Sequence, residues 1–387
     1  MRHVHYASIA AFIATMALTR GAAADAPWAS ESALPEAMAE GPSSAAALAR
    51  ACGKPEAKLA RVAAALVERK KSGAIYLEGD GLSELLRRAG EAHVWPRAWI
   101  ASGRDLDDAQ ASPRLEKFGA ALPTEGERRC GAARITLEDG SQIAAAVALD
   151  AVADLDAPLP TRGRTGQWIE LKATVNIAAT GARVVITGPH GAPKPVQTAW
   201  DGKHARARFV LSEPGAFTVQ LMADGKRGPR PVLEARLFAD VSPESDLNSA
   251  TVPGEDAGKD FKGTDRDALY AMVDALRTSE VLKKLKRDPR LEKLAEEHAA
   301  RMEQARAVGH DVGDGDPFER AEEAGLGADA VGENVANAES LVAAHRTLYR
   351  SPSHRGNLVR AEYTHMGFAV RKGKTGYWVT EVFATIR

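Results

Sequence analysis

The sequence lacks a surplus of charge of either sign. Its 51 lysines and arginines face 52 aspartates and glutamates, and the formal net charge is −1. A nucleic-acid partner normally requires a basic cluster, and the one short cluster, Arg69-Lys70-Lys71, is typical of a solvated helix end. We therefore expect no nucleic acid among the partners of this protein.

Long apolar runs are also missing beyond the N-terminus, where no stretch approaches the roughly 18 continuous apolar residues of a membrane-spanning helix. The apolar run at 6–18 has a basic start and is followed by three alanines ending at Ala24, which is typical of a signal peptide over residues 1–24. Arg20 interrupts the approach to the cleavage site. We expect export to the periplasm or out of the cell, and no membrane span after cleavage.

Cysteine is scarce, since the chain has only Cys52 and Cys130. An even pair in a chain that enters an oxidising compartment favours a structural disulfide over a catalytic thiol. We therefore predict a Cys52–Cys130 bridge that closes a large loop.

A chain of 387 residues exceeds the usual size of one hydrophobic core, so several domains are expected. Residues 28–152 combine apolar residues at helical spacing over 45–89 with a β-hairpin pattern around Asp139-Gly140. This pattern predicts an α+β domain that the disulfide closes.

Residues 157–241 have a different composition, with short alternating segments separated by turn signals such as Asp201-Gly202 and Pro214-Gly215. Strands at this spacing predict a small immunoglobulin-like β-sandwich. The stretch 242–262 is rich in Ser, Pro, Gly, Asp and Glu and is interpreted as a linker. A third domain, 263–387, follows it, so the predicted class is α+β and multidomain.

In the third domain a helix can begin at Thr264 or Asp265, and a second helix from about Asp288. The apolar stripe of the second helix includes His298, which we expect to be packed and hydrogen-bonded. Two other histidines, His345 and His365, are expected at the surface.

An ordered series of motifs follows these helices: Gly309-His310, Gly332-Glu333-Asn334-Val335-Ala336, Ser351-Pro352-Ser353-His354-Arg355-Gly356-Asn357-Leu358, Met366-Gly367-Phe368 and Tyr377-Trp378-Val379-Thr380-Glu381-Val382-Phe383. In this order they resemble a CAP domain (the SCP/PR-1 superfamily) of bacterial type. The resemblance covers nearly all of 263–387. It implies an α-β-α sandwich in which an antiparallel sheet, containing 366–370 and 377–384, lies between helices.

The resemblance also implies a central cleft that gathers His310, Glu333 and His354. Ser351 stands near the place of a second glutamate in the family, so that acidic member is missing here. The residues that would support the cleft are Asn334, Ser351, Arg355 and Asn357.

Independently of the family, two imidazoles and a carboxylate are a sufficient ligand set for zinc with an open position for water. Their spacing differs from the helix-borne HExxH of zinc proteases, so their assembly depends on the tertiary fold. These residues alone do not justify a metal site, but with the resemblance added we favour a polar cleft that binds zinc or another divalent metal weakly over a catalytic zinc centre.

Each site residue also has a structural interpretation. Glu333 and Asn334 can pin a loop before a helix from about Ala338, and Arg355 and Asn357 can brace backbone or carboxylates. The aspartate-rich stretch 311–316 lacks the length and the terminal glutamate of a calcium loop. We interpret it as a flexible turn.

The first domain echoes the third in outline, because Ser112-Pro113 and Cys130-Gly131 precede a two-stranded ending as Ser351-Pro352 and Met366-Gly367 do. One interpretation is a degenerate CAP-like copy without the cleft glutamate and the second histidine. An unrelated helical cap domain is the other.

Together these observations favour an exported, non-catalytic binding module. Its cleft would hold a small ligand, a lipid, an envelope component or a divalent metal, while the sandwich serves as a spacer or adhesive module. The alternative is a secreted hydrolase or peptidase that uses zinc-bound water, Ser351 or Ser353, although the chain has no GxSxG nucleophile motif. A structural envelope protein with a vestigial cleft is a further alternative.

Overall fold

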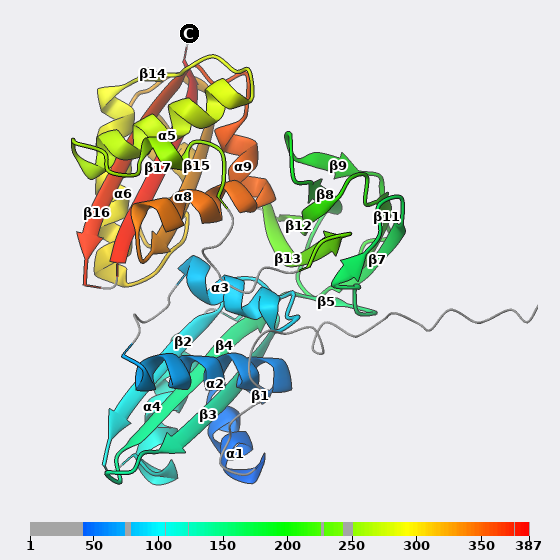
Figure 1. Cartoon of the computed structure of the whole chain (residues 1–387), viewed down its shortest axis with the longest axis vertical. Coiled ribbons are helices and arrows are strands. Elements are labelled where there is room, and N and C mark those ends of the chain that lie inside the picture. The colour runs from blue at the N-terminus through cyan, green and yellow to red at the C-terminus, as the bar shows by residue number, and fades with distance from the viewer. Residues whose placement is uncertain are drawn as a thin grey trace, which may run out of the picture.

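The computed structural model describes residues 42–73, 79–104, 106–122, 124–225, 228–242, 251–374 and 376–386. These residues form an N-terminal unit, a middle unit of strands alone and a C-terminal unit that lies against both of the others (Figure 1). The mixed content of helices and several sheets confirms the predicted α+β multidomain class. The predicted signal peptide, 1–24, lies outside the described residues. Among those described, no helix is long and apolar enough to cross a membrane.

The N-terminal unit is a four-stranded sheet with helices on both faces. Its helices are α1 (Pro42–Cys52), α2 (Ala57–Lys71), α3 (Gly79–Arg88) and α4 (Asp108–Ala120), and its strands are β1 (Lys54–Pro55), β2 (Arg97–Gly103), β3 (Glu127–Thr136) and β4 (Gln142–Ala151). The strand order is β1-β3-β4-β2, and β3 and β4 form the predicted hairpin. Helices α2 and α3 cover one face, and α1 and α4 the other, so successive residues of β4 are buried on opposite sides.

The predicted disulfide is present and joins α1 to β3. Cys52 and Cys130 have a Cα–Cα distance of 5.8 Å and are 78 residues apart in sequence. Both cysteines belong to the core between α1, α4 and the sheet. The bridge therefore ties the first helix of the unit to its central hairpin.

Two sheets of the middle unit enclose one core. The strands are β5 (Ala153–Leu155), β6 (Arg162–Gly163), β7 (Trp168–Val175), β8 (Gly181–Thr187), β9 (Lys194–Val196), β10 (Thr198–Trp200), β11 (His204–Val210), β12 (Gly215–Gly225) and β13 (Gly228–Ala239). They are ordered β10-β11-β7-β5 in one sheet and β6-β13-β12-β8-β9 in the other. Buried and exposed residues alternate along β7 and β11, because one face of each strand meets the core and the other meets solvent.

The C-terminal unit is an α-β-α sandwich, as the resemblance implies. Its elements are a 3-10 turn (Glu255–Ala257), α5 (Asp265–Ser279), β14 (Lys286–Arg287), α6 (Pro289–Ala305), α7 (Pro317–Glu323), β15 (Ala328–Ala338), α8 (Leu341–Arg350), α9 (Pro352–Leu358), β16 (His365–Gly373) and β17 (Gly376–Ile386). The strand order is β14-β16-β17-β15. Helices α5, α8 and α9 cover one face, and α6 and α7 the other.

The helix starts predicted for this unit are confirmed, but one loop is not. Thr264 caps α5 by accepting from the Asp267 N–H, and Asp288 caps α6 by accepting from the Arg290 N–H. The interpretation of Glu333 and Asn334 as parts of a loop before a helix is wrong. Both lie within β15, and the next helix begins only after Ser340.

The N-terminal and C-terminal units share one topology. In each, a two-residue strand runs parallel to the first strand of a hairpin, and the fourth strand pairs with the second. Gly131 and Gly367 hold equivalent places, since a Cβ at either would lie 2.0 to 2.2 Å from backbone of the helix that follows the short strand. Only glycine allows that helix to approach so closely.

The stretch 251–262, predicted to be part of a linker, packs on the C-terminal unit instead. The Arg346 guanidinium binds Glu255, which is buried, and lowers the pKa of that carboxyl to about 2. The expectation of a surface position for His345 is wrong. This ring is fully buried under the same stretch, where its Nε2 lies 2.9 Å from the Pro253 carbonyl oxygen.

Candidate functional site

Glu333 lies at the centre of a polar cluster on β15. Its Oε1 is 2.9 Å from Nδ1 of His310, and its Oε2 accepts from the Arg320 guanidinium. Arg320 also donates to the backbone carbonyl of His310, at 2.9 Å. The carboxylate is buried, whereas the His310 side chain is 41% exposed. Glu333 therefore holds His310 at the rim of the cleft, and both carboxylate oxygens have partners.

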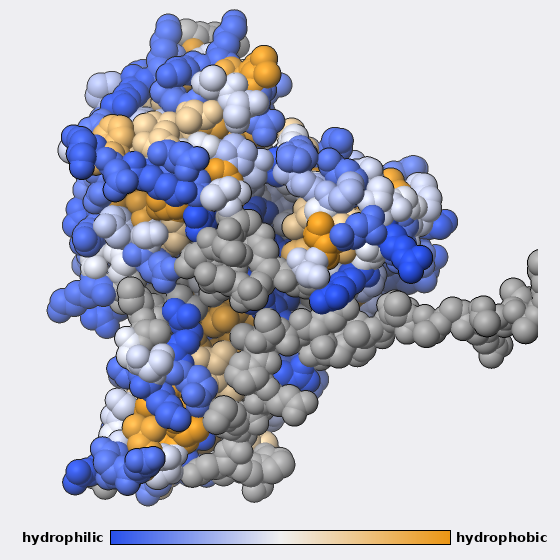
Figure 2. All heavy atoms as spheres, in the orientation of Figure 1, coloured by the Kyte–Doolittle hydropathy of each residue, from blue (hydrophilic) through white to orange (hydrophobic). Residues whose placement is uncertain are grey.

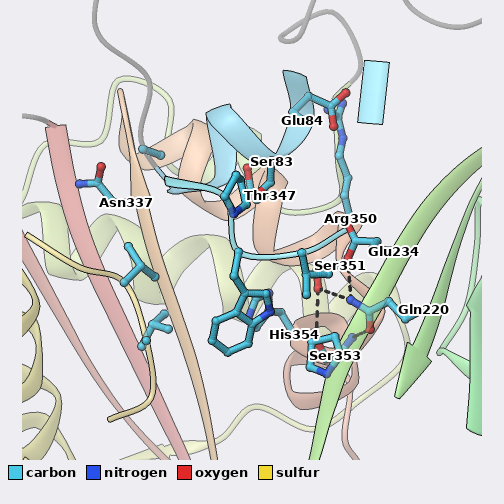
Figure 3. Close-up of a pocket in the computed structure, with 18 of the residues that line it drawn as sticks. Ser83, Glu84, Gln220, Glu234, Asn337, Thr347, Arg350, Ser351, Ser353 and His354 are labelled. Atoms are coloured by element: carbon cyan, nitrogen blue, oxygen red, sulfur yellow. Dashed lines mark hydrogen bonds between the residues drawn. The ribbon is translucent and has the colours of Figure 1, made fainter. Parts of the chain in front are cut away.

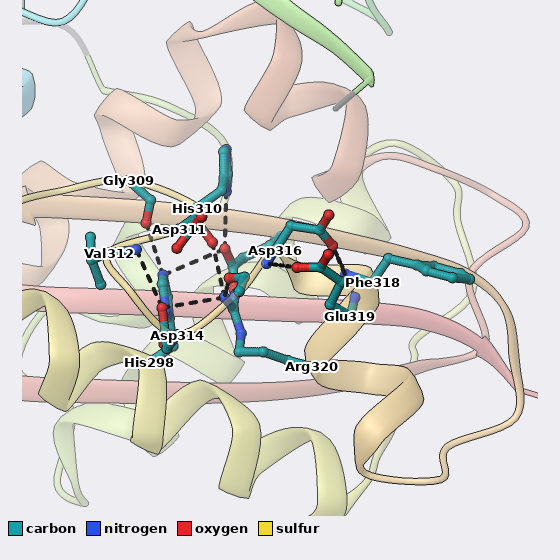
Figure 4. A network of polar contacts seen from close by, with 12 residues as sticks. His298, Gly309, His310, Asp311, Val312, Asp314, Asp316, Phe318, Glu319 and Arg320 are labelled. Atoms are coloured by element: carbon teal, nitrogen blue, oxygen red, sulfur yellow. Dashed lines mark hydrogen bonds and ion pairs between the residues drawn. The ribbon is translucent and has the colours of Figure 1, made fainter. Parts of the chain in front are cut away.

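His298 on α6 stands behind this cluster, fully buried and hydrogen-bonded as its spacing predicts. Its Nδ1 is 2.8 Å from Asp314 and its Nε2 is 2.9 Å from the Gly309 carbonyl (Figure 4). Burial acts to raise the pKa of Asp314, but the hydrogen bond and charge of His298 together with Arg320 and the Val312 N–H outweigh it, so the pKa is lowered. The turn at 311–316, expected to be flexible, is thus tied to α6.

His354 on α9 is the second imidazole of the site. Its Nδ1 is buried and has no hydrogen-bond partner among the described residues. Burial, followed by the electrostatic effect of His310, lowers the pKa of His354 to about 4. At neutral pH the ring is therefore uncharged and carries an unused hydrogen-bonding nitrogen.

A chain of hydrogen-bonded amides leads from the cleft to Glu381 on β17. Asn357 donates to Asn334 at 2.9 Å, and Asn334 donates to Glu381 at 2.9 Å and to the His354 carbonyl at 3.2 Å. Glu381 is fully buried, and its burial raises the pKa to about 8. No role is predicted for Glu381 from the sequence, although a glutamate amid apolar residues of a strand is a signal that could have singled it out.

The other cleft-support residues join elements of the fold. Arg355 donates to the Gly188 carbonyl of the middle unit at 3.2 Å and lies over the Tyr349 ring. Asn357 also donates to the Glu333 carbonyl, at 3.1 Å. Ser351 Oγ lies 3.2 Å from Ser353 Oγ. The Ser351 hydroxyl therefore contacts another hydroxyl and a side chain of the middle unit.

The implied metal does not fit this arrangement. Among the described residues, no group of three or more His, Cys, Asp or Glu side chains is placed to hold a metal ion. Both oxygens of Glu333 already bind His310 and Arg320, and a zinc site needs three or four ligands free to converge. The cluster is better described as a hydrogen-bonded scaffold for His310.

The cleft opens into a pocket of about 610 Å³ where all three units meet. His310, Glu333 and His354 line it together with residues of α3 and of strands β12 and β13. Figure 3 shows Gln220 and Glu234 of the middle unit beside Ser351, Ser353 and His354. The sequence predicts only a spacer or adhesive role for the sandwich, and nothing in its own pattern marks these two residues.

Part-buried hydrogen bonds link the three units in the wall of the pocket. Arg87 of α3 donates to Glu234 at 3.1 Å, and Gln220 donates to the other oxygen of Glu234 at 2.6 Å. Gln220 also donates to Ser351 Oγ at 3.3 Å and accepts from the Ser353 N–H at 3.1 Å. Burial acts to raise the pKa of Glu234, but Arg87 and Gln220 hold it below its ordinary value.

The N-terminal unit has no such cluster at the equivalent place. In the C-terminal unit, the residue that lies in register two strands away from the equivalent glycine is Glu333. In the N-terminal unit, the residue in the same position relative to its glycine is Ala98. In the same way Glu381 is matched by Ala146. The N-terminal unit therefore replaces the two buried carboxylates with alanine.

Residues 270–383 match the family model described as CAP, the cysteine-rich secretory protein family. This match confirms the resemblance that the motifs indicate, so the C-terminal unit contains a CAP domain. No curated protein matches the chain. At the surface, hydrophilic residues cover most of the described part of this unit on the face shown in Figure 2.

Solved structures are similar to parts of the chain. An outer surface protein of Borrelia burgdorferi is 23% identical over 32% of this chain and 93% of its own, with a TM-score of 0.31. An extracellular protein of Bacillus anthracis that contains an SCP domain is 16% identical, over 60% and 86%, with a TM-score of 0.30. A cysteine-rich secretory protein of Staphylococcus aureus is 15% identical, over 60% and 84%, with a TM-score of 0.28. These values carry no conclusion about ligand or activity.

Proposed function

Because residues 270–383 form a CAP domain, we propose that this chain is an exported, non-catalytic binding protein whose CAP cleft holds a small ligand. The observation that supports the proposal is the pocket of about 610 Å³ into which both His310 and His354 face. A concave site of this size with a few convergent polar groups is typical of small-ligand recognition. Export is proposed from the apolar N-terminal run.

The hydrogen bonds of the cleft favour binding over hydrolysis. A serine nucleophile needs a base that holds its hydroxyl, an orienting carboxylate and an oxyanion hole. Ser351 Oγ makes hydrogen bonds with Ser353 and Gln220, neither of which is a base. Both oxygens of Glu333 are engaged, one by His310 and the other by Arg320. These groups are arranged to recognise a ligand and to position one another.

We further propose that the N-terminal unit is an internal, degenerate copy of the CAP domain. The shared strand order, the equivalent glycines and the alanines in place of Glu333 and Glu381 support this proposal. Its role is then to close the pocket of the C-terminal copy, since α3 contributes to the pocket lining.

The proposed function can be tested with an anionic aromatic dye, 8-anilinonaphthalene-1-sulfonate, as a general probe of the pocket. We expect saturable fluorescence with the wild-type chain and its loss in the double variant His310→Ala/His354→Ala. The matched control is His190→Ala/His204→Ala, which removes two exposed histidines of the middle unit. The thermal midpoints of all three proteins must agree, so that a change in binding is not a change in folding.

The same proteins distinguish binding from catalysis. Labelled casein and p-nitrophenyl acetate should remain intact with the wild-type chain. Hydrolysis that is lost in the His310→Ala/His354→Ala variant would favour the hydrolase alternative. Dye binding that is equal in all three proteins would remove the cleft from consideration and favour a structural role.

A further inference from the structure

The two sheets of the middle unit have different surroundings. The sheet that contains β12 and β13 contacts the other units, for example through Gln220 and Glu234. Strands β7 and β11 of the second sheet lie on the side of the sandwich away from both of those units (Figure 1). Every second residue of these strands faces out of the sandwich and is exposed or half-buried. The outer face that they form is defined by Trp168, Glu170, Lys172, Arg206 and Arg208.

Charges on the outer face are arranged against the stability of the sheet. Lys172 and Arg206 lie directly opposite each other on β7 and β11. Like charges in this position repel each other and weaken strand pairing. The packing of the sheet therefore gives no reason for this pair, whereas an anionic partner would remove the repulsion.

The two arginines of the outer face keep their charges unpaired. Glu170 is the only carboxylate in β7 and β11, and its Oε2 lies 2.8 Å from Lys172 Nζ. Arg206 and Arg208 are exposed, and within the described ranges neither side chain has a carboxylate at ion-pair distance. Their guanidinium groups are therefore available to an anion from outside the chain.

The middle unit as a whole is basic. Residues 157–241 contain 12 lysines and arginines against 6 aspartates and glutamates, whereas the rest of the chain contains 39 against 46. The formal net charge of −1 conceals this local excess. Two acidic side chains at the border of the outer face are engaged, Asp156 by the Thr174 hydroxyl and Asp201 by the His204 ring. The unit should therefore be attracted to negatively charged surfaces.

Trp168 adds an amphipathic aromatic group beside these cations. The residue is 61% exposed, and the Arg208 guanidinium carbon lies 5.6 Å from the centre of its ring. An indole has an apolar body and a polar N–H, and tryptophan is enriched where membranes meet water. Lipid phosphates occupy the same layer and bind guanidinium groups. An exposed indole beside two unpaired arginines therefore matches an anionic membrane surface better than a soluble polyanion, which offers no apolar layer.

We propose that the outer face of the middle unit binds the protein to the surface of an anionic phospholipid membrane. Arg206 and Arg208 pair with headgroup phosphates, and Trp168 enters the layer between the headgroups and the acyl chains. The pocket is lined by the opposite sheet, through β12 and β13, so it stays open when the outer face is occupied. Membrane binding is thus independent of the ligand that the pocket holds.

The test is co-sedimentation of the mature chain with sucrose-loaded vesicles at 0.1 M salt. We expect binding to vesicles of phosphatidylglycerol and phosphatidylcholine, and little to phosphatidylcholine alone. Arg206→Gln/Arg208→Gln should weaken binding at least about tenfold, because both lost charges lie at the membrane surface. The matched control, Arg183→Gln/Lys194→Gln, removes the same charge from the other sheet. It should bind within about threefold of the wild type, since salt screens charges more than about 10 Å away.

Brominated phosphatidylcholine in the same vesicles tests entry of the indole, because bromine quenches only tryptophan that reaches the lipid. We expect quenching with the wild-type chain and its loss in Trp168→Ala, together with weaker sedimentation. Trp95→Ala, which removes another exposed tryptophan outside the middle unit, is the control and should still be quenched. The thermal midpoints of all variants must agree with that of the wild type.

Each other outcome counts against the proposal. Equal sedimentation with neutral vesicles would overturn the role of charge, and equal losses in the two double variants would overturn the outer face. Quenching that persists in Trp168→Ala would place the membrane contact elsewhere. Tighter binding of dextran sulfate than of anionic vesicles would identify a soluble polyanion as the partner instead. His310→Ala/His354→Ala should sediment as the wild type does, and a loss there would assign the membrane to the CAP cleft.

Discussion

The buried carboxyl of Glu381 allows a sharp test of the polar core beneath the cleft. Its pKa is raised from an ordinary value of 4.5 to about 8, because burial disfavours the charged form. The folded chain therefore keeps this proton at neutral pH, whereas the unfolded chain loses it above about pH 4.5. A raised carboxyl pKa weakens folding as pH rises from 4.5 to 8, since the folded state binds more protons over that window.

The magnitude follows from the size of the pKa shift. Each unit corresponds to about 1.36 kcal/mol, so moving from pH 5 to pH 8 should cost the C-terminal unit up to about 4 kcal/mol. For a unit of this size that is a fall of roughly 15 °C in its thermal midpoint. In Glu381→Gln the amide carbonyl can still accept from Asn334, but no proton is exchanged, so this part of the pH dependence should disappear.

Scanning calorimetry of both proteins at pH 5 and pH 8 measures the effect. The Glu381→Gln midpoint should exceed the wild-type midpoint at pH 8 and approach it at pH 5. Glu323→Gln, which alters an exposed glutamate, is the control and should behave as the wild type does. An equal fall in midpoint for the wild type and Glu381→Gln would show that Glu381 is ionised in the folded chain, and the reasoning from burial would be wrong.

Three further predictions concern the framework around the pocket. The carboxylate partners of His93 outweigh its burial and raise its pKa from 6.5 to about 9. The stabilisation that protonated His93 provides is therefore complete below pH 6.5 and lost as the pH rises through 9. In chemical denaturation, His93→Gln should be less stable than the wild type by about 3 kcal/mol at pH 6 and nearly as stable at pH 10. Gly367→Ala should cost about 2–3 kcal/mol in urea unfolding, because its Cβ would lie 2.2 Å from the Leu291 backbone, whereas a Cβ at the half-buried control Gly356 meets nothing within 4 Å. Cys52→Ser/Cys130→Ser should cost about 2–5 kcal/mol through the freed loop, and an unchanged urea midpoint would contradict a structural role for the bridge.

Local sequence patterns were sufficient to predict several helices and strands of the fold. The short alternating segments predicted within 157–241 are strands, as at β7, and Thr264 and Asp288 begin helices where their capping side chains predict. These predictions are confirmed because a helix cap or a strand face depends on neighbours only a few residues away in the sequence. The prediction of a surface position for His345 is wrong for the opposite reason. Its helical surroundings say nothing of the segment at 251–255 that crosses over it.

Sequence by itself determined the CAP motifs, the single disulfide and the places of His310, Glu333 and His354 on one unit. Only the tertiary structure decided that Glu333 is bound by Arg320, that Glu381 holds its proton, and that the cleft is completed from elsewhere in the chain. The physical reason is distance along the sequence. Gln220 meets Ser351 across 131 residues, and whether such a polar group is buried, paired or left facing a ligand depends on how separately folded units pack.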